Sequence, residues 1–192
     1  MKEPKAKRKW GMMLLIVIIM IGTSFSVFLF NASPQSQVVK YNDIKFRNNG
    51  NAWLANIDGK TAAFSFLPGD VQNITSSSEL PFLLRNKIEI DTTSSLNDTY
   101  KAAIALAQHQ MGLTLGNYNL YVRRGFDSNN TFNFPVITCY NATQNVPVVH
   151  FQSANSTEII IEKNCVIVNA QAEEDIIKAK DKLVYIIVGV IK

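Results

Sequence analysis

Residues 11–30 form a mostly apolar stretch without a charged side chain. About 20 such residues are enough for a helix to cross the hydrocarbon layer of a membrane. Five basic residues and one acid lie in the ten positions before it, and a basic flank is typical of the cytoplasmic side. The pattern predicts a basic cytoplasmic tail over 1–10, a transmembrane helix over 11–30, and an extracytoplasmic location for the rest of the chain.

Two other interpretations of this segment remain open. A cleaved signal peptide usually has an apolar core of ~7–15 residues that ends in small side chains, whereas Phe28-Leu29-Phe30 closes this longer run. A pilin-like signal at Lys9-Trp10-Gly11 would require the helix to continue, and the proline at position 34 should stop it. We therefore expect a retained single-pass anchor and a cell-membrane location.

After a polar linker over 31–37, the alternation of apolar and polar residues predicts an antiparallel meander over Val38–Leu67. Asn48–Asn51 and Asp58-Gly59 are its turns, and Asp-Gly favours a two-residue hairpin because both positions tolerate positive φ. Trp53 belongs to one of these strands. Its aromatic ring could line a ligand groove, but the strand spacing favours a place in the core.

The second half of the chain predicts a mixture of strands and helices. Phe82–Ile90 and Leu120–Arg124 are expected strands, joined through a helix near Leu96–Met111 that Gly112 should end. Strand, helix and strand in this order indicate one parallel crossover. Val148–Gln152 and Glu158–Glu162 are expected to pair with each other.

The last segment predicts a helix near Glu173–Ile191, with three acids in its first turn and an apolar stripe that should dock on the sheet. Lys180, Asp181 and Lys182 are expected on its exposed face. The predicted fold class is therefore α+β: an N-terminal transmembrane helix and one outer domain, 38–192, with a mainly antiparallel sheet and two packed helices.

The formal charge of +4 comes from 19 basic and 15 acidic residues. Because the first ten residues hold five of the bases and one of the acids, the remainder is balanced at 14 of each. The basic character therefore belongs to the N-terminal tail, and we expect no nucleic-acid partner.

The two cysteines, Cys139 and Cys165, both lie in the predicted outer domain. Disulfides persist outside the reducing cytoplasm, and two cysteines without a nearby histidine pair do not make a zinc site by spacing. We predict a Cys139–Cys165 disulfide, with two buried free thiols as the alternative. We expect no metal and no cofactor.

Asn-x-Ser/Thr sequences mark acceptor sites for N-linked glycans on exported proteins. Six occur without an intervening proline, at Asn31, Asn73, Asn97, Asn129, Asn141 and Asn155.

The chain offers few residues with catalytic character. His109 and His150 are the only histidines, and the sequence pairs neither with the positioned partner that a general base needs. Arg123-Arg124-Gly125 could hold an anion, since guanidinium groups match carboxylate or phosphate, or could be a solvated strand end. Trp53, Arg124 and His150 are the candidate ligand-binding residues.

A resemblance to one group of proteins rests on several motifs of the outer domain: Trp53 with Phe64–Pro68, Arg124-Gly125-Phe126, Cys139 with Asn141–Thr143 and Val146-Pro147, and Asn164-Cys165 followed by Lys180-Asp181 and Tyr185. With these motifs the chain resembles uncharacterised single-pass membrane proteins of small-genome archaea. The resemblance covers most of the outer domain. It implies an archaeal envelope location and no particular activity.

These observations favour a membrane-tethered extracytoplasmic domain that binds an envelope protein partner or helps to organise the envelope. A hydrolase-like envelope enzyme is the first alternative, and it requires a pocket that joins a histidine to a carboxylate or to Arg124. A small-ligand receptor domain is the second, and it requires an aromatic groove at Trp53.

Overall fold

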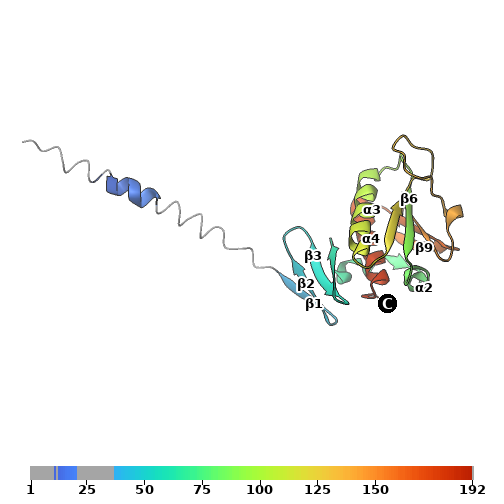
Figure 1. The fold of residues 1–192 in the computed structure, drawn as a ribbon, viewed down its shortest axis with the longest axis horizontal. Helices are drawn as coiled ribbons and strands as arrows, with labels where there is room; N and C mark the ends of the chain where they lie inside the picture. The colour runs from blue at the N-terminus through green and yellow to red at the C-terminus, as the bar shows by residue number, and fades with distance from the viewer. Residues whose placement is uncertain (1–10, 12, 21–36, 192) are drawn as a thin grey trace, which may run out of the picture. The chain divides into compact units, whose positions relative to one another are not determined.

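The computed structural model describes residues 11, 13–20 and 37–191. The chain divides into two compact units, Met1–Ser36 and Gln37–Lys192. In the first unit, residues 11 and 13–20 are helical. The second unit contains all the strands and the remaining helices that the structure describes (Figure 1).

The predicted transmembrane helix and single-pass location are contradicted. Among the described residues no helix is long and apolar enough to cross a membrane. A crossing needs about 20 consecutive apolar residues, whereas the longest helix of the second unit has 16 and carries polar side chains. Residues 12 and 21–30 of the predicted span lie outside the described residues.

The first sheet is the antiparallel meander that the sequence predicts. It contains β1 (Val38–Tyr41), β2 (Ile44–Asn48), β3 (Trp53–Ile57) and β4 (Lys60–Phe64), paired in chain order. Asp58 and Gly59 join β3 to β4 with φ values of 51° and 77°, as a two-residue hairpin requires. Local turn chemistry therefore decides this part of the fold.

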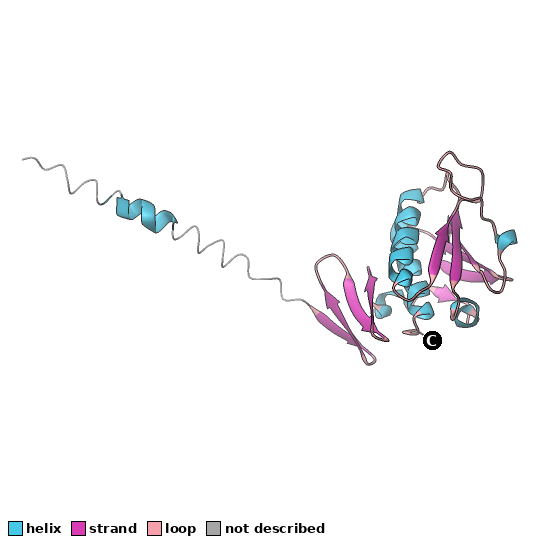
Figure 2. Cartoon of the chain, viewed as in Figure 1, coloured by secondary structure: helices cyan, strands magenta, loops and turns pink. Residues whose placement is uncertain are grey.

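The second sheet has six strands in the order β5-β9-β10-β8-β6-β7. Its strands are β5 (Thr75–Ser76), β6 (Glu89–Ser94), β7 (Tyr121–Arg124), β8 (Val148–Ser153), β9 (Glu158–Glu162) and β10 (Cys165–Ala170). The helices of this unit are η1 (Pro68–Val71), α2 (Leu80–Leu84), α3 (Lys101–Gly116), η2 (Cys139–Asn141) and α4 (Glu173–Ile187), shown in Figure 2.

The predicted α+β class with a mainly antiparallel sheet is wrong for this larger sheet. Only β9 and β10 pair antiparallel, and the other four pairings are parallel. The fold is therefore mixed α/β with two sheets. Parallel neighbours need crossover connections of a dozen or more residues, and α3 and the long 125–147 segment provide two of them.

The order of β8, β9 and β10 also differs from the expected pairing. Val148–Gln152 and Glu158–Glu162 do not pair with each other, because β10 is inserted between them and bonds to both strands. The turn at Lys163-Asn164 makes this possible, with Lys163 at a φ of 59°. The strand expected at Phe82–Ile90 does not begin at Phe82, because residues 82–84 belong to the short helix α2 instead.

Helices α3 and α4 lie against each other on one face of the six-stranded sheet (Figure 1). Their apolar residues join those of β6, β8 and β10 in one core. The opposite face carries a smaller cluster, in which Ile137, Val148 and Cys165 pack together. The sheet is thus covered by helices on one side and by the 126–147 segment on the other.

The four-stranded sheet is attached to α4 through buried polar groups. The Asp181 carboxylate accepts hydrogen bonds from the backbone N–H groups of Ser65 and Phe66, at 2.8 and 2.9 Å, and pairs with the ammonium of Lys180. The Tyr185 hydroxyl donates to the Phe66 carbonyl at 2.6 Å. The expectation of an exposed face at Lys180, Asp181 and Lys182 is therefore wrong, since all three are buried.

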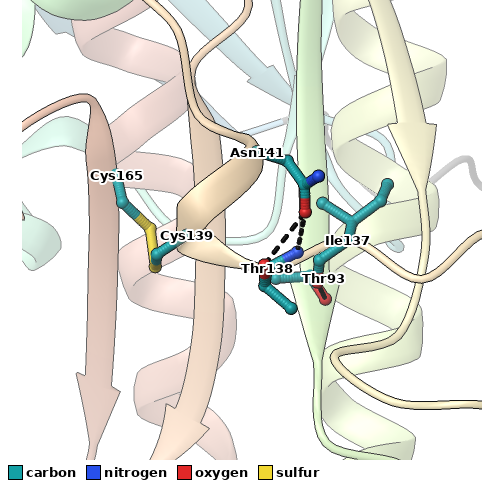
Figure 3. The surroundings of a disulfide bond; sticks show 6 residues. All are labelled: Thr93, Ile137, Thr138, Cys139, Asn141 and Cys165. Carbon is teal, nitrogen blue, oxygen red and sulfur yellow. Dashed lines mark hydrogen bonds between the residues drawn. A yellow bond between two sulfur atoms is a disulfide. The ribbon is translucent and has the colours of Figure 1, made fainter.

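The predicted disulfide is confirmed. Cys139 and Cys165 are bonded, with 5.2 Å between their Cα atoms (Figure 3). Cys165 begins β10, and Cys139 begins the η2 turn. The bond holds the 126–147 segment to the sheet, together with the Thr93 hydroxyl, which donates to the Ile137 carbonyl at 2.7 Å.

Candidate functional site

Strand β7 forms one edge of the six-stranded sheet, and β6 is its only partner among the described strands. The Tyr121 N–H donates to the Ile88 carbonyl and the Gly125 N–H to the Thr92 carbonyl, both at 2.9 Å. Backbone groups of successive strand residues point to opposite sides. The N–H and C=O groups of Val122 and Arg124 therefore face away from the sheet.

Just after β7, at Phe126, the outer side of the strand is already hydrogen-bonded to another segment of the same chain. The Phe126 N–H donates to the Pro135 carbonyl at 3.0 Å, and the Ile137 N–H donates to the Phe126 carbonyl at 2.7 Å. These bonds form a short parallel bridge between Phe126 and Val136. The outer side of the β7 extension is thus geometrically able to receive a strand.

A hollow of about 380 Å³ lies between this edge and α3. Its walls come from one side of α3 and from the segment that leads into and through β7. The lining residues are Gln108, His109, Gly112, Leu113, Gly116, Asn119, Leu120, Tyr121, Val122 and Arg124.

Gly112 and Gly116 have no side chains to fill the hollow on its α3 side. A Cβ atom added at Gly112 would contact Val122 at 3.9 Å, and one added at Gly116 would meet nothing within 4 Å. Gly112 lies inside α3, where glycine costs roughly 1 kcal/mol relative to alanine, and Gly116 is the last residue of the helix. The predicted helix end at Gly112 is wrong, because the helix continues to Gly116.

A second hollow, of about 210 Å³, lies against the N-terminal half of α3. It is lined by Ser94, Leu96, Lys101, Ala102, Ala105, Gln108 and Phe126. Gln108 lines both hollows. We call the two hollows together with the outer edge of β7 the α3–β7 groove.

The Gln108 side chain is 6% exposed, and its Nε2 has no hydrogen-bond partner in the described part of the chain. A buried amide without a partner costs about 1–3 kcal/mol. Most buried polar groups in proteins are paired. The Nε2 atom is itself buried, so it can pair with an oxygen supplied from outside only when the Gln108 side chain turns into the groove.

The two adjacent arginines of β7 have different surroundings. Arg123 donates two hydrogen bonds of 2.7 Å to the buried Asp91 carboxylate and lies 3.4 Å from Glu89. The hydrogen bonds with Asp91 raise the pKa of Arg123. Arg124 is exposed on the other face, with its guanidinium 5.6 Å from the ring centroid of Phe134. None of the ion pairs found among the described residues involves Arg124.

The groove is electropositive. Arg124 and Lys101 line it, and neither hollow is lined by a carboxylate. Helix α3 begins with Lys101 and has no acid in its first turn. Asp98, just before the helix, accepts bonds from Tyr100 and Ser153.

The structure does not bring Trp53, Arg124 and His150 together. Trp53 lies in the four-stranded sheet and packs against the core, as the strand spacing suggested. Arg124 lies in register with Thr92 on β6, whereas His150 lies in register with the next residue, Thr93. The side chains of Arg124 and His150 therefore project from opposite faces of the sheet.

His150 is half-buried on the face that the 126–147 segment covers. Burial lowers its pKa, and the negative charges of Asp127 and Asp98 oppose that effect. His109, the other histidine, shares the first hollow with Arg124 but not with any carboxylate, serine or cysteine.

Two further observations concern ligands and modification. Among the described residues, no group of three or more His, Cys, Asp or Glu side chains could hold a metal ion. The predicted glycan acceptors Asn73, Asn97, Asn129, Asn141 and Asn155 are exposed. Asn31 lies outside the described residues, and glycosylation stays a prediction.

Sequence reasoning found Arg124 but missed Gln108 and the groove. The available signal was the row of small residues at 102, 105, 112 and 116, which follows one side of α3. Small residues on a helix indicate a groove only if the helix lies beside an open strand edge, and the sequence alone does not place α3 beside β7.

Comparison of the chain with protein-family models, with curated proteins and with solved structures found no match.

Proposed function

We propose that residues 37–192 form a protein-binding domain that adds an extended segment of a partner to the outer edge of β7. Strand addition uses main-chain hydrogen bonds for affinity and neighbouring pockets for specificity. The observation that carries the proposal is the open edge of β7 beside a groove that contains an unpaired buried amide.

The geometry limits the strength of such an interaction. The two outward residues of β7 offer four backbone groups, and each hydrogen bond contributes a net ~0.5–1.5 kcal/mol. The exposed side chain of Leu113 adds apolar area at the mouth of the groove. We therefore expect reversible binding, in the range of transient peptide recognition.

The charge of the edge favours a different protein over a second copy of this chain. Strand β7 carries two arginines among its four residues. Arg123 is paired with Asp91 and Glu89, but self-pairing would bring together the Arg124 side chains of two copies, and like charges on paired strands are destabilising. A partner with acidic residues complements the same surface.

The hydrolase-like alternative finds less support in this geometry. His109 and Arg124 share a hollow, but a general base needs a partner that orients it, and the lining supplies no carboxylate for that role. The receptor alternative required a groove at Trp53, which instead packs against the core.

The test uses the full chain and peptides selected from an immobilised library of random sequences with blocked termini. Val122→Pro removes an outward N–H that the sheet does not use, so binding should fall while the fold is kept. Val38→Pro is the matched control. Val38 begins β1, an edge strand of the other sheet, and the Asn48 N–H bond to Gln37 places the Val38 N–H on the outer side.

A second measurement does not depend on the folding of a variant. N-methylation of the bound peptide at alternate residues should abolish binding, because those N–H groups would face β7. Loss of affinity in Val122→Pro and at alternate N-methyl positions supports the proposal. Equal affinity in Val122→Pro and Val38→Pro, with no effect of N-methylation, overturns it. Concentration-dependent dimerisation abolished by Val122→Pro would identify a second copy as the occupant and would also overturn it.

A further inference from the structure

The most specific features of the α3–β7 groove are two donor groups on the same hollow. The Arg124 guanidinium has no ion-pair partner among the described residues, and the Gln108 Nε2 has no hydrogen-bond partner there. Both side chains line the hollow of about 380 Å³. An unpaired guanidinium on one wall and a side-chain amide on the other are suited to an oxygen-rich, negatively charged group, provided that the Gln108 amide, whose Nε2 is buried, turns into the hollow.

The Arg124 side chain is already positioned for this role. Its guanidinium lies 5.6 Å from the ring centroid of Phe134, which in turn contacts Phe126 edge-on at 5.8 Å. A cation held over an aromatic ring loses less conformational freedom when it binds an anion. Arg123 is not equivalent, because Asp91 and Glu89 neutralise it on the other face.

We propose that the groove selects partner strands that carry an acidic side chain, whose carboxylate binds Arg124 while the Gln108 amide turns into the groove and donates to a neighbouring oxygen of the strand. This inference rests on the proposed strand addition and specifies the partner.

A carboxylate could come from an acidic side chain or from a chain terminus. The groove favours a side chain, because the second hollow continues beyond Gln108 towards Lys101 and Phe126. The bound segment is therefore not required to end at Arg124. Lys101 lies on the same path and extends the positive surface along α3.

The first test measures the affinity of a selected acidic peptide and of the same peptide with its acid replaced by the corresponding amide. Arg124→Gln should weaken the acidic peptide about tenfold or more and leave the amide peptide unchanged. Arg47→Gln is the matched control, since Arg47 is an exposed arginine on β2 of the other sheet. Added salt should weaken only the acidic peptide, because exposed charges are screened.

The second test addresses Gln108. Gln108→Leu removes a buried amide that has no partner, so thermal stability should not fall, whereas the affinity for the selected peptide should. This combination separates a recognition role from a structural one. Reduced stability together with unchanged affinity overturns the assignment of Gln108.

The outcomes distinguish the inference from the function on which it rests. If peptides lose affinity in Val122→Pro but bind equally well as acid and amide, acidic selection is overturned and strand addition stands. If a peptide made with a free C-terminus and without the acidic side chain binds, and amidation of that terminus abolishes its binding, a terminal carboxylate replaces the acidic side chain and the inference is overturned. If no selected peptide responds to Val122→Pro, the proposed function itself fails.

Discussion

At the scale of single residues, Asp181 links the two sheets. Burial raises the pKa of its carboxyl group, and the Lys180 ammonium and two backbone N–H donors oppose that effect. Removing one member of a buried ion pair leaves the other charge uncompensated, which typically costs about 3–5 kcal/mol. The four-stranded sheet therefore depends on a side chain of α4 that lies 115 or more residues away in the sequence.

Asp181→Ala should lower the free energy of unfolding by about 3–5 kcal/mol, measured by urea denaturation. The double variant with Lys180→Met should recover part of that loss, because it also removes the buried Lys180 ammonium that Asp181→Ala leaves without its partner. Asp43→Ala serves as the control, since Asp43 is fully exposed. A loss in Asp181→Ala no larger than that in the control would contradict the account of this cluster.

His150 predicts a dependence of stability on pH. Its pKa is lowered from 6.5 in the folded state, so below pH 6.5 the unfolded chain binds a proton more readily than the folded one. Stability should therefore fall as the pH drops from 7 through 6.5 and should level off below the folded pKa. His150→Gln should flatten this part of the profile. Superimposable profiles of the two proteins would show that His150 does not contribute.

At the scale of elements, the sequence predicted what local patterns determine. The meander of β1–β4 follows from alternation and from the positive-φ turn at Asp58-Gly59. The apolar stripes of α3 and α4 were also recognisable. The parallel order of the larger sheet was not, because the choice between neighbours depends on connections across the sheet. The insertion of β10 between β8 and β9 is the clearest case.

The same limit explains why the buried charges of α4 were expected on its surface. Charged residues are rarely buried unless they are paired, so a sequence-based reading places Lys180, Asp181 and Lys182 in solvent. Their partners are Ser65, Phe66 and Ile74, which lie in the chain that follows β4. The groove was missed for a related reason, since it requires α3 and β7 to be placed side by side.

At Gly112 of α3, helix stability and peptide affinity should respond in opposite directions to a larger side chain. Gly112→Ala increases helix propensity and places a methyl group at an ordinary contact distance of 3.9 Å from Val122. It should raise the free energy of unfolding by about 0.5–1 kcal/mol. The same methyl group makes the groove shallower, so the affinity for a selected peptide should fall. A stabilised variant with undiminished affinity would place the peptide outside this hollow.

At the scale of the whole molecule, the disulfide joins the 126–147 segment to the central strands. Its two cysteines are 26 residues apart, for which the chain-entropy relation predicts roughly 3.5 kcal/mol of stabilisation. Reduction of the wild-type protein should lower its urea midpoint accordingly. The Cys139→Ala/Cys165→Ala variant should start at the lower midpoint and not respond to reductant. A response of that variant would show that reductant acts elsewhere.

The central claim is that a partner segment adds to the outer edge of β7, and amide hydrogen exchange tests it most directly. In the free protein the N–H groups of Val122 and Arg124 face away from the sheet, whereas those of Tyr121 and Gly125 are bonded to β6. A selected peptide should slow exchange at Val122 and Arg124 and leave Tyr121 and Gly125 nearly unchanged. Slowed exchange confined to another edge such as β1, or no change along β7 at saturating peptide, would contradict the account.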